Sequence, residues 1–126
     1  MSDERKFFRC NVCGNLVGLI LEGGGELVCC GQPMELLVAN TTDAAQEKHV
    51  PVGKRENGKL SVQIGSVPHP MIAKHYIQWI AVSQGERLQI ASLQPGEAPA
   101  AVFDVEEGPA VVYEYCNIHG LWKAEL

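Results

Sequence analysis

The chain has 126 residues, of which 46% are hydrophobic and 20% are charged, a composition typical of a folded globular protein. Its formal net charge of −5 disfavours nucleic-acid binding, which usually requires a basic surface. No apolar run approaches the length of a membrane span, and the first ten residues lack the apolar segment of a secretion signal. We therefore expect a cytoplasmic protein that does not bind membranes, in which cysteines more often bind metals or react than form structural disulfides.

In chain order, the first predicted unit spans about residues 7–36 and is a small hairpin with two thiols at each end. Its predicted parts are the turn Cys10 to Cys13, a strand at 16–21, a glycine turn at 22–25 and a strand at 26–28 that leads to Cys29 and Cys30. A unit this small has too little core to fold unaided, so a bound metal would stabilise it.

From about residue 38 onward, apolar and polar residues alternate as they do in half-buried strands. The alternating runs lie at residues 60–65, 76–80, 88–91 and 111–116, and glycine or proline breaks separate them. No helical pattern of useful length occurs. This spacing predicts an antiparallel sandwich or barrel.

The four N-terminal cysteines follow the pattern C-x2-C-x15-C-C. Four thiolates on two turns can surround one tetrahedral ion, and the donor type alone does not choose between zinc and iron. Adjacent cysteines point apart in an extended chain, so we expect Cys29 and Cys30 to distort the tetrahedron. The alternative is a redox-active or disulfide-bonded set of thiols, although the odd total of five cysteines excludes complete pairing within one chain.

A second group of possible ligands contains every histidine of the chain and the remaining cysteine: His49, His69, His75, Cys116 and His119. A single histidine is more often a core or partly exposed residue than a ligand. Here, however, prolines on both sides of His69 fix its loop, and His75 follows six residues later. Cys116 and His119 lie at a strand end and in the loop after it, where a sandwich gathers ligands.

These five donors would leave one position open on an octahedral metal, as in catalytic sites. Zinc rarely takes five nitrogen and sulfur ligands. A blue-copper site would use two histidines and usually a methionine, which does not follow His119. Iron therefore fits this donor set best.

The motifs that carry these residues resemble those of desulfoferrodoxins, the two-iron class of superoxide reductases. They occur in order as Cys10-x-x-Cys13 with Cys29-Cys30-Gly31, Glu47-Lys48-His49-Val50-Pro51, Gly65 to Met71 with Lys74-His75-Tyr76-Ile77, and Glu114 to Gly120. The resemblance covers nearly the whole chain and includes every cysteine and histidine.

The resemblance implies an all-β chain of two domains with two irons per chain. Residues 1–37 are expected to form a desulforedoxin-like domain with an Fe(Cys)4 centre on Cys10, Cys13, Cys29 and Cys30. Residues 38–126 are expected to form an immunoglobulin-like antiparallel β-sandwich that carries an Fe(His)4Cys centre. Its implied ligands are His49, His69, His75 and His119 in the equatorial plane and Cys116 in the axial position.

The implied reaction is the one-electron reduction of superoxide to hydrogen peroxide, with electrons from rubredoxin or a similar donor. The family also implies a homodimer. Glu47 is expected to occupy the sixth position of the ferric site, and Lys48 to attract superoxide and help deliver protons. Without the resemblance, Lys48 would be interpreted as an ordinary solvated lysine. With it, one local cation can steer an anion despite the negative net charge.

Three other functions stay open at this point. The chain could be a pure electron carrier, although carriers minimise ligand change and an open position argues against one. It could be a zinc-stabilised binding module, which would be colourless. It could also be a superoxide dismutase, which would evolve oxygen during turnover.

Overall fold

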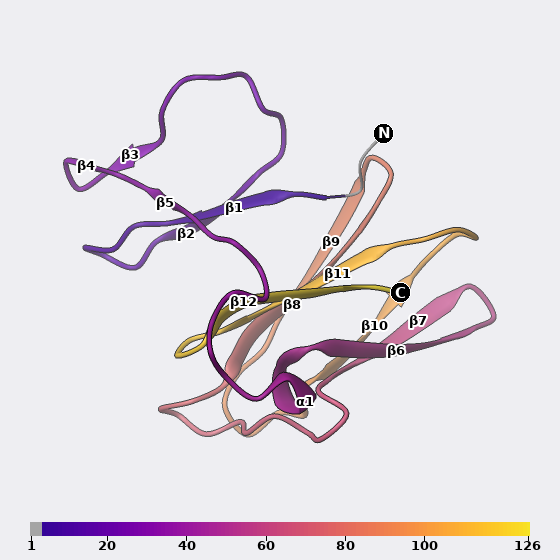
Figure 1. Cartoon of the computed structure of the whole chain (residues 1–126). Coiled ribbons are helices and arrows are strands. Elements are labelled where there is room, and N and C mark those ends of the chain that lie inside the picture. Colours follow the sequence, from indigo (N-terminus) through magenta and orange to yellow (C-terminus); the bar gives the residue numbers. More distant parts are fainter. Residues whose placement is uncertain (1–3) are drawn as a thin grey trace. The chain divides into compact units, whose positions relative to one another are not determined.

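The computed structural model describes residues 4–126, which divide into two compact units, Glu4–Val38 and Ala39–Leu126. Regular structure in the described part is almost entirely β-strand, with one short helix, α1 (Gln46–His49) (Figure 1). That part of the chain has no helix that is long and apolar enough to cross a membrane. The predicted all-β fold class is confirmed.

The unit Glu4–Val38 contains two small antiparallel sheets. Its strands are β1 (Lys6–Arg9), β2 (Leu16–Leu19), β3 (Val28–Cys29), β4 (Gln32–Pro33) and β5 (Glu35–Leu36). β1 lies between β2 and β5, and β3 pairs with β4. The strand predicted at 26–28 is displaced, because it begins at Val28 and continues to Cys29.

This unit has very little interior. Within residues 4–38, the buried side chains are those of Phe7 and Cys10. By contrast, Ile20 is 73% exposed and Leu21 is 83% exposed. Strands of two to four residues with so little apolar burial do not form a stable domain without a cross-link or a metal.

The unit Ala39–Leu126 is an antiparallel sandwich of two sheets. After α1 its strands are β6 (Pro51–Glu56), β7 (Lys59–Ile64), β8 (Ile77–Gln84), β9 (Arg87–Ser92), β10 (Ala100–Asp104), β11 (Val111–Cys116) and β12 (Gly120–Glu125). One sheet has the order β10-β7-β6 and the other has the order β12-β11-β8-β9. The predicted immunoglobulin-like sandwich architecture is confirmed.

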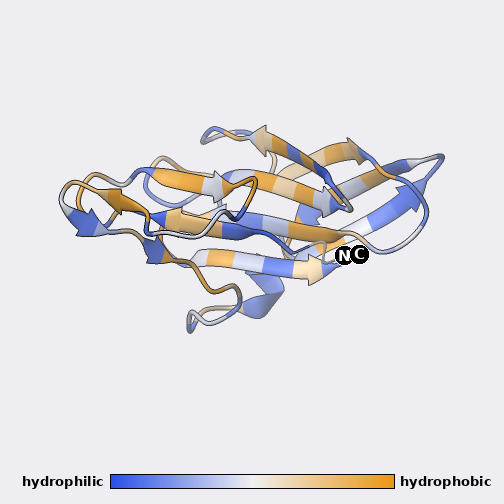
Figure 2. Cartoon of the chain, turned by 90° about the horizontal axis from the view of Figure 1, so that it is seen from above, coloured by the Kyte–Doolittle hydropathy of each residue, from blue (hydrophilic) through white to orange (hydrophobic). Residues whose placement is uncertain are grey.

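The core of the sandwich lies between these sheets. Along β7, Leu60, Val62 and Ile64 are buried while the residues between them are exposed, which is the period-two pattern of a strand with one buried face. Figure 2 shows this alternation of hydrophobic and hydrophilic residues along several strands. β8 and β11 contribute Ile80 and Val112 to the same cluster. Strand β11 is buried along its whole length, so its last residue, Cys116, lies in the protein interior.

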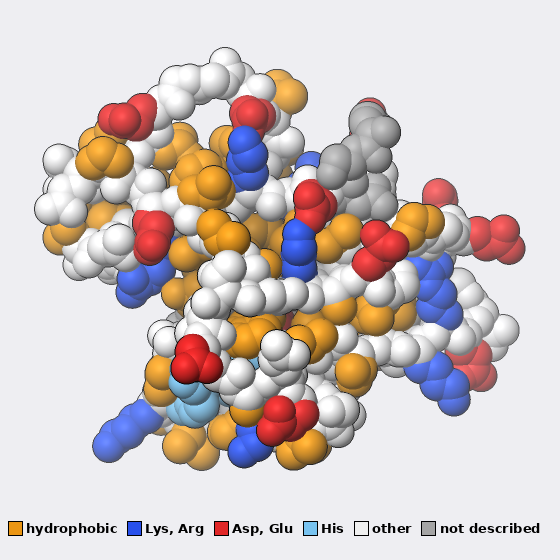
Figure 3. Space-filling view, in the orientation of Figure 1, with side chains coloured by type: hydrophobic (Ala, Val, Ile, Leu, Met, Phe, Trp, Pro, Cys, Tyr) orange, Lys and Arg blue, Asp and Glu red, His pale blue; other side chains and the backbone are white. Residues whose placement is uncertain are grey.

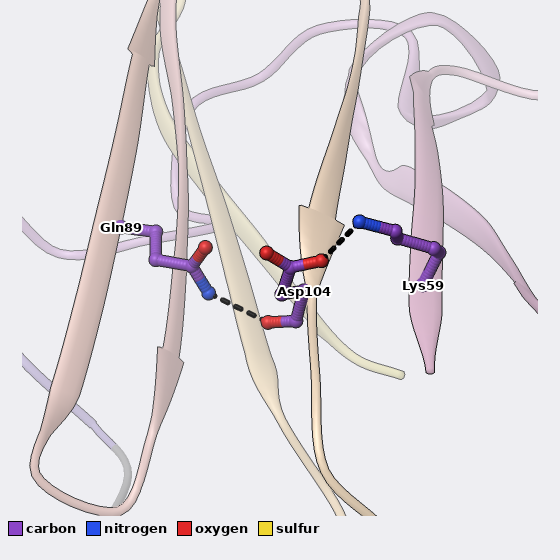
Figure 4. A network of polar contacts seen from close by, with 3 residues as sticks. All are labelled: Lys59, Gln89 and Asp104. Carbon is purple, nitrogen blue, oxygen red and sulfur yellow. Dashed lines mark hydrogen bonds and ion pairs between the residues drawn. The ribbon is translucent and has the colours of Figure 1, made fainter. Parts of the chain in front are cut away.

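A network of polar contacts at the surface links the two sheets of the sandwich (Figure 4). Lys59 of β7 forms an ion pair with the carboxylate of Asp104 on β10. The side-chain amide of Gln89, on β9 of the other sheet, donates to the carbonyl oxygen of Asp104 at 2.8 Å. Both partners of the ion pair are exposed, so it adds little to stability.

Candidate metal centres

The four N-terminal cysteines converge on one point. Their Sγ atoms all lie within 4.8 Å of one another, and all four are free thiols. Cys13 Sγ lies 3.7 Å from Cys29 Sγ, and Cys29 Sγ lies 3.9 Å from Cys30 Sγ. Metal–sulfur bonds of about 2.3 Å in a tetrahedron place the sulfurs about 3.8 Å apart. These separations fit a tetrahedral metal and are far too long for a disulfide.

The backbone at Cys30 explains how adjacent cysteines reach the same point. Cys30 has a φ of +52°, in the left-handed region, and Gly31 follows with a φ of +73°. The backbone at Cys30 is therefore not extended, and the distortion of the tetrahedron expected from the adjacent cysteines stays a prediction. The left-handed turn brings the two sulfurs to the same side, at a conformational cost of about 1–3 kcal/mol for a non-glycine residue.

Hydrogen bonds and neighbouring thiols shift the acidity of this cluster in opposite directions. The backbone amides of Cys13 and Val12 lower the pKa of Cys10 to about 6. Hydrogen bonding to Cys13 raises the pKa of Cys30 to about 12 and also raises that of Cys29. Thiols that compete for one negative charge behave in this way, and a cation among them would remove the competition.

The second cluster is assembled from five separate places in the sandwich. His49 ends α1, His69 lies in the loop after β7, His75 precedes β8, Cys116 ends β11 and His119 lies in the turn before β12. One donor atom from each side chain lies within 4.8 Å of all the others. Figure 3 shows histidine at the surface in one place on the visible face, next to acidic and basic side chains.

A break in the pairing of β11 with β8 helps to aim the thiol. Tyr115 pairs with Trp79, but Cys116 pairs with Ile77, so the register shifts between Tyr115 and Cys116. Such bulges bend a strand and redirect its side chains, and they are common next to functional sites. Cys116 is fully buried and packs with the sandwich core.

Backbone carbonyls orient two of the imidazole rings. The Nδ1 atom of His49 lies 2.7 Å from the carbonyl oxygen of Ala45, and the Nδ1 atom of His69 lies 2.6 Å from that of Pro70. A carbonyl can only accept, so each Nδ1 carries the proton and each Nε2 is free to bind a metal. The two Nε2 atoms lie 3.2 Å apart, and the His49 Nε2 atom lies 3.1 Å from Nδ1 of His119.

The ring of His75 provides an independent test of whether a metal fits. Its Nε2 atom is buried and has no hydrogen-bond partner in the described part of the chain. A buried nitrogen without a partner costs about 1–3 kcal/mol. His75 belongs to the group of five residues with converging donor atoms, so a metal ion bound through this nitrogen would satisfy it. The donor set and this orphaned atom both fit a bound transition metal.

Burial favours the neutral imidazoles that a metal requires. It lowers the pKa of His69 to about 4 and also lowers the pKa of His49 and of His75. Burial raises the pKa of the Cys116 thiol, while the backbone amides of His119 and Ile118 oppose that shift. The amide of His119 donates to Cys116 Sγ at 3.4 Å, so the sulfur has a backbone hydrogen bond from its own turn.

Glu47 and Lys48 lie on α1 immediately before His49, and both side chains are exposed. The carbonyl oxygen of Glu47 accepts hydrogen bonds from the amide of Val67 at 2.9 Å and from the hydroxyl of Ser66 at 3.3 Å. The positive charge of Lys48 helps to lower the pKa of His75, after burial and His119. Within residues 4–126, the carboxylate of Glu47 is not part of the five-donor group.

The sequence did not predict the contacts of two side chains near the cluster, those of Trp122 and Asn117. The indole of Trp122 stacks on the ring of His49 at a centroid distance of 4.9 Å, and its Nε1 donates to the carbonyl of His119 at 3.1 Å. The amide side chain of Asn117 bonds to backbone atoms on both sides of His75. The available signal was that Asn117 lies within a ligand-bearing motif and Trp122 just after it. The side-chain partners of Asn117 and the ring of His49 that Trp122 stacks on are distant in sequence.

Comparison with known proteins identifies the family. The sequence model of desulfoferrodoxin matches residues 41–125, and that of the desulfoferrodoxin N-terminal domain matches residues 2–37. A desulfoferrodoxin from Desulfarculus baarsii is 50% identical over 125 residues, covering 99% of each chain. A desulfoferrodoxin homolog from Methanothermobacter thermautotrophicus is 51% identical, covering 97% of this chain and 99% of the other.

Solved structures agree with this result. The superoxide reductase from Treponema pallidum has a TM-score of 0.77 and 31% identity, covering 96% of this chain and 98% of that one. A superoxide reductase described as 1Fe-SOR, from Giardia intestinalis, has a TM-score of 0.56 and 30% identity. This match covers 64% of the present chain and 97% of the Giardia intestinalis chain. The sandwich, the two clusters and these matches together show that the chain belongs to the desulfoferrodoxin family.

Proposed function

We propose that this protein is a superoxide reductase that converts superoxide to hydrogen peroxide. Each superoxide takes up one electron and two protons to give one hydrogen peroxide. The convergence of four imidazoles and one thiol carries the proposal, in a chain of the desulfoferrodoxin family. Relatives named superoxide reductase support it, such as the one from Pyrococcus horikoshii at 34% identity.

The two clusters fit two iron centres per chain. The proposed ligands are Cys10, Cys13, Cys29 and Cys30 within a domain at 1–37, and His49, His69, His75, Cys116 and His119 within a domain at 38–126. Ferrous iron bound at the second centre would supply the electron that superoxide takes up, and the five proposed donors would hold it.

The protein residues around the second centre control access and charge. His49, His69 and Cys116 are buried, so the inner side of the cluster is closed to water. His75 and His119 are partly exposed, and superoxide is expected to approach from their side. Lys48 is proposed to provide positive charge there and to help protons from solvent reach the product, and Glu47 is proposed to cap the oxidised site.

Replacement of Lys48 by alanine is expected to lower the second-order rate constant for superoxide about tenfold at low salt. The loss should shrink as ionic strength rises, because salt screens an exposed charge over about 10 Å at 0.1 M. Stopped-flow or pulse-radiolysis kinetics at several salt concentrations would measure both effects.

Lys54→Ala is the matched control, since Lys54 is also exposed but lies on β6. It should keep the wild-type rate and salt dependence. Equal behaviour of the two variants would show that Lys48 acts only through the net charge of the protein.

The proposed function is tested by three measurements on one preparation: iron content, visible spectrum and products. We expect about two irons per chain, thiolate-to-iron bands from the first centre, and a further band when the second centre is oxidised. Superoxide consumption should yield hydrogen peroxide without oxygen. Oxygen evolution would indicate dismutation. A colourless zinc protein with no activity would leave a metal-stabilised binding module.

The remaining parts of the proposal concern the partners and the cell compartment. Electrons are proposed to come from rubredoxin or a similar small redox protein, and the chain is proposed to form a homodimer in the cytoplasm. The exposed Ile20 and Leu21 of the first unit are consistent with a further protein surface covering it. Sedimentation velocity tests the dimer directly, and a sedimentation coefficient of a monomer would exclude it.

A further inference from the structure

The side chain of Asn117 lies between two ligand-bearing segments of the second centre. Its Oδ1 atom accepts a hydrogen bond from the backbone amide of Tyr76 at 2.9 Å. Its Nδ2 atom donates to the carbonyl oxygen of Lys74 at 3.0 Å. One amide group therefore bonds to the peptide groups on both sides of His75.

The bonding pattern differs from that of an ordinary turn asparagine. An asparagine in a turn usually bonds to its own backbone about two residues away. The two amide bonds of Asn117 instead reach 41 and 43 residues along the sequence. The backbone amide of Asn117 adds a third bond across the same gap, to the carbonyl oxygen of Tyr76 at 3.3 Å.

The backbone hydrogen bonds of His75 itself do not attach its segment to the other ligand-bearing segments. Its backbone N–H and C=O both bond to Ile72, at 3.0 and 3.1 Å, so these bonds close a small turn upon itself. His49 and His69 have a backbone carbonyl against the ring, whereas the two Asn117 bonds grip the main chain on either side of His75. The bonds from Asn117 attach the His75 turn to the segment that begins with Cys116.

We propose that Asn117 is a positioning residue of the second metal centre, which fixes His75 relative to Cys116 and His119 through its two side-chain hydrogen bonds. This proposal rests on the proposed function because it requires a metal at the second centre. It does not require that superoxide is the substrate. Asn117 follows Cys116 directly and precedes His119 by two residues, so it couples three of the five donors. Loss of such a contact outside the ligand set typically weakens metal binding about 10- to 100-fold.

The same sandwich contains a matched control. The side-chain amide of Asn40 also bonds to both backbone groups of one distant residue, donating to the carbonyl of Lys123 at 3.1 Å and accepting from its amide at 2.8 Å. Lys123 lies on the edge strand β12 and is not a candidate ligand. Asn40→Ala therefore removes the same kind of double hydrogen bond from a residue that is not one of the five donors.

The experiment challenges the iron-loaded full chain with a ferrous chelator under anaerobic conditions. Asn117→Ala should lose second-centre iron about tenfold faster than the wild type, and its second-centre absorption band should shift after oxidation. Asn40→Ala should keep the wild-type iron retention and absorption band, even if its thermal midpoint falls as far as that of Asn117→Ala. The bands of the first, all-thiolate centre serve as an internal reference, because they should not change in either variant.

Asn117→Asp keeps the acceptor for the amide of Tyr76 but places a carboxylate oxygen against the carbonyl of Lys74. It should retain iron less well than the wild type and better than Asn117→Ala, and it provides the test if Asn117→Ala does not fold. Wild-type iron retention and an unshifted band in the folded Asn117 variant would overturn the proposal. A protein that holds iron normally but does not reduce superoxide would instead overturn the proposed function.

Discussion

Replacing Gly65 by alanine is expected to displace helix α1, which carries Glu47 and Lys48. Gly65 has a φ of +84°, and a Cβ atom there would lie 2.3 Å from the carbonyl oxygen of Val67. It would also lie 2.7 Å from the Glu47 carbonyl oxygen and 2.7 Å from the Lys48 Cα atom. All three are backbone atoms, so no side chain can move aside to relieve the clash.

The expected cost is about 2–4 kcal/mol of unfolding free energy, since a left-handed backbone and a steric overlap act together. The rate with superoxide should fall at least as far as in Lys48→Ala. Urea denaturation and stopped-flow kinetics would measure the two effects. If displacement of Lys48 is the cause, adding Lys48→Ala to Gly65→Ala should lower the rate little further.

The variant Gly85→Ala separates the left-handed backbone penalty from the steric overlap in the expected loss of unfolding free energy. Gly85 has a φ of +59°, but a Cβ atom there would meet no heavy atom within 4 Å. It should cost only the left-handed backbone penalty of about 1–2 kcal/mol and leave the rate unchanged. Equal losses of stability and unchanged rates in both variants would show that Gly65 does not hold α1 in place.

Replacement of Cys10 by serine is expected to unfold residues 4–38 while residues 39–126 stay folded. Cys10 and Phe7 are the buried residues of the first unit in its described part, and Cys10 is also one of the four converging thiols. In small metal domains the metal supplies about 10 kcal/mol or more of folding free energy. Losing one of four ligands removes most of that contribution from a unit with little core.

Limited proteolysis with mass spectrometry would follow each unit separately. In the Cys10→Ser variant, trypsin should cut rapidly after Arg9, while the sandwich resists cleavage and keeps its second-centre band. Asn11→Ser is the control, because Asn11 is exposed on the same turn and is not a thiol ligand. It should retain protease resistance. Protection of Arg9 in Cys10→Ser would mean that packing alone holds this unit together.

The sequence by itself determined the two donor sets, because cysteine and histidine are scarce in this chain and each occurs in a recognisable motif. It also determined the all-β class, since the alternation along residues 60–64 reflects one buried and one exposed face. The strands β6, β10 and β12 were not among the predicted runs. All three are edge strands, and β6 is exposed after its first residue, so no alternation marks it.

Only the tertiary structure decided how the donors meet. The left-handed turn at Cys30 and the close fit around Gly65 depend on backbone angles and approaches that composition does not encode. The ring orientations of His49 and His69 depend on carbonyl partners, and the support of His75 depends on Asn117, which lies 42 residues further along the chain. Local pattern selects which residues can bind a metal, whereas long-range hydrogen bonds and packing fix their geometry.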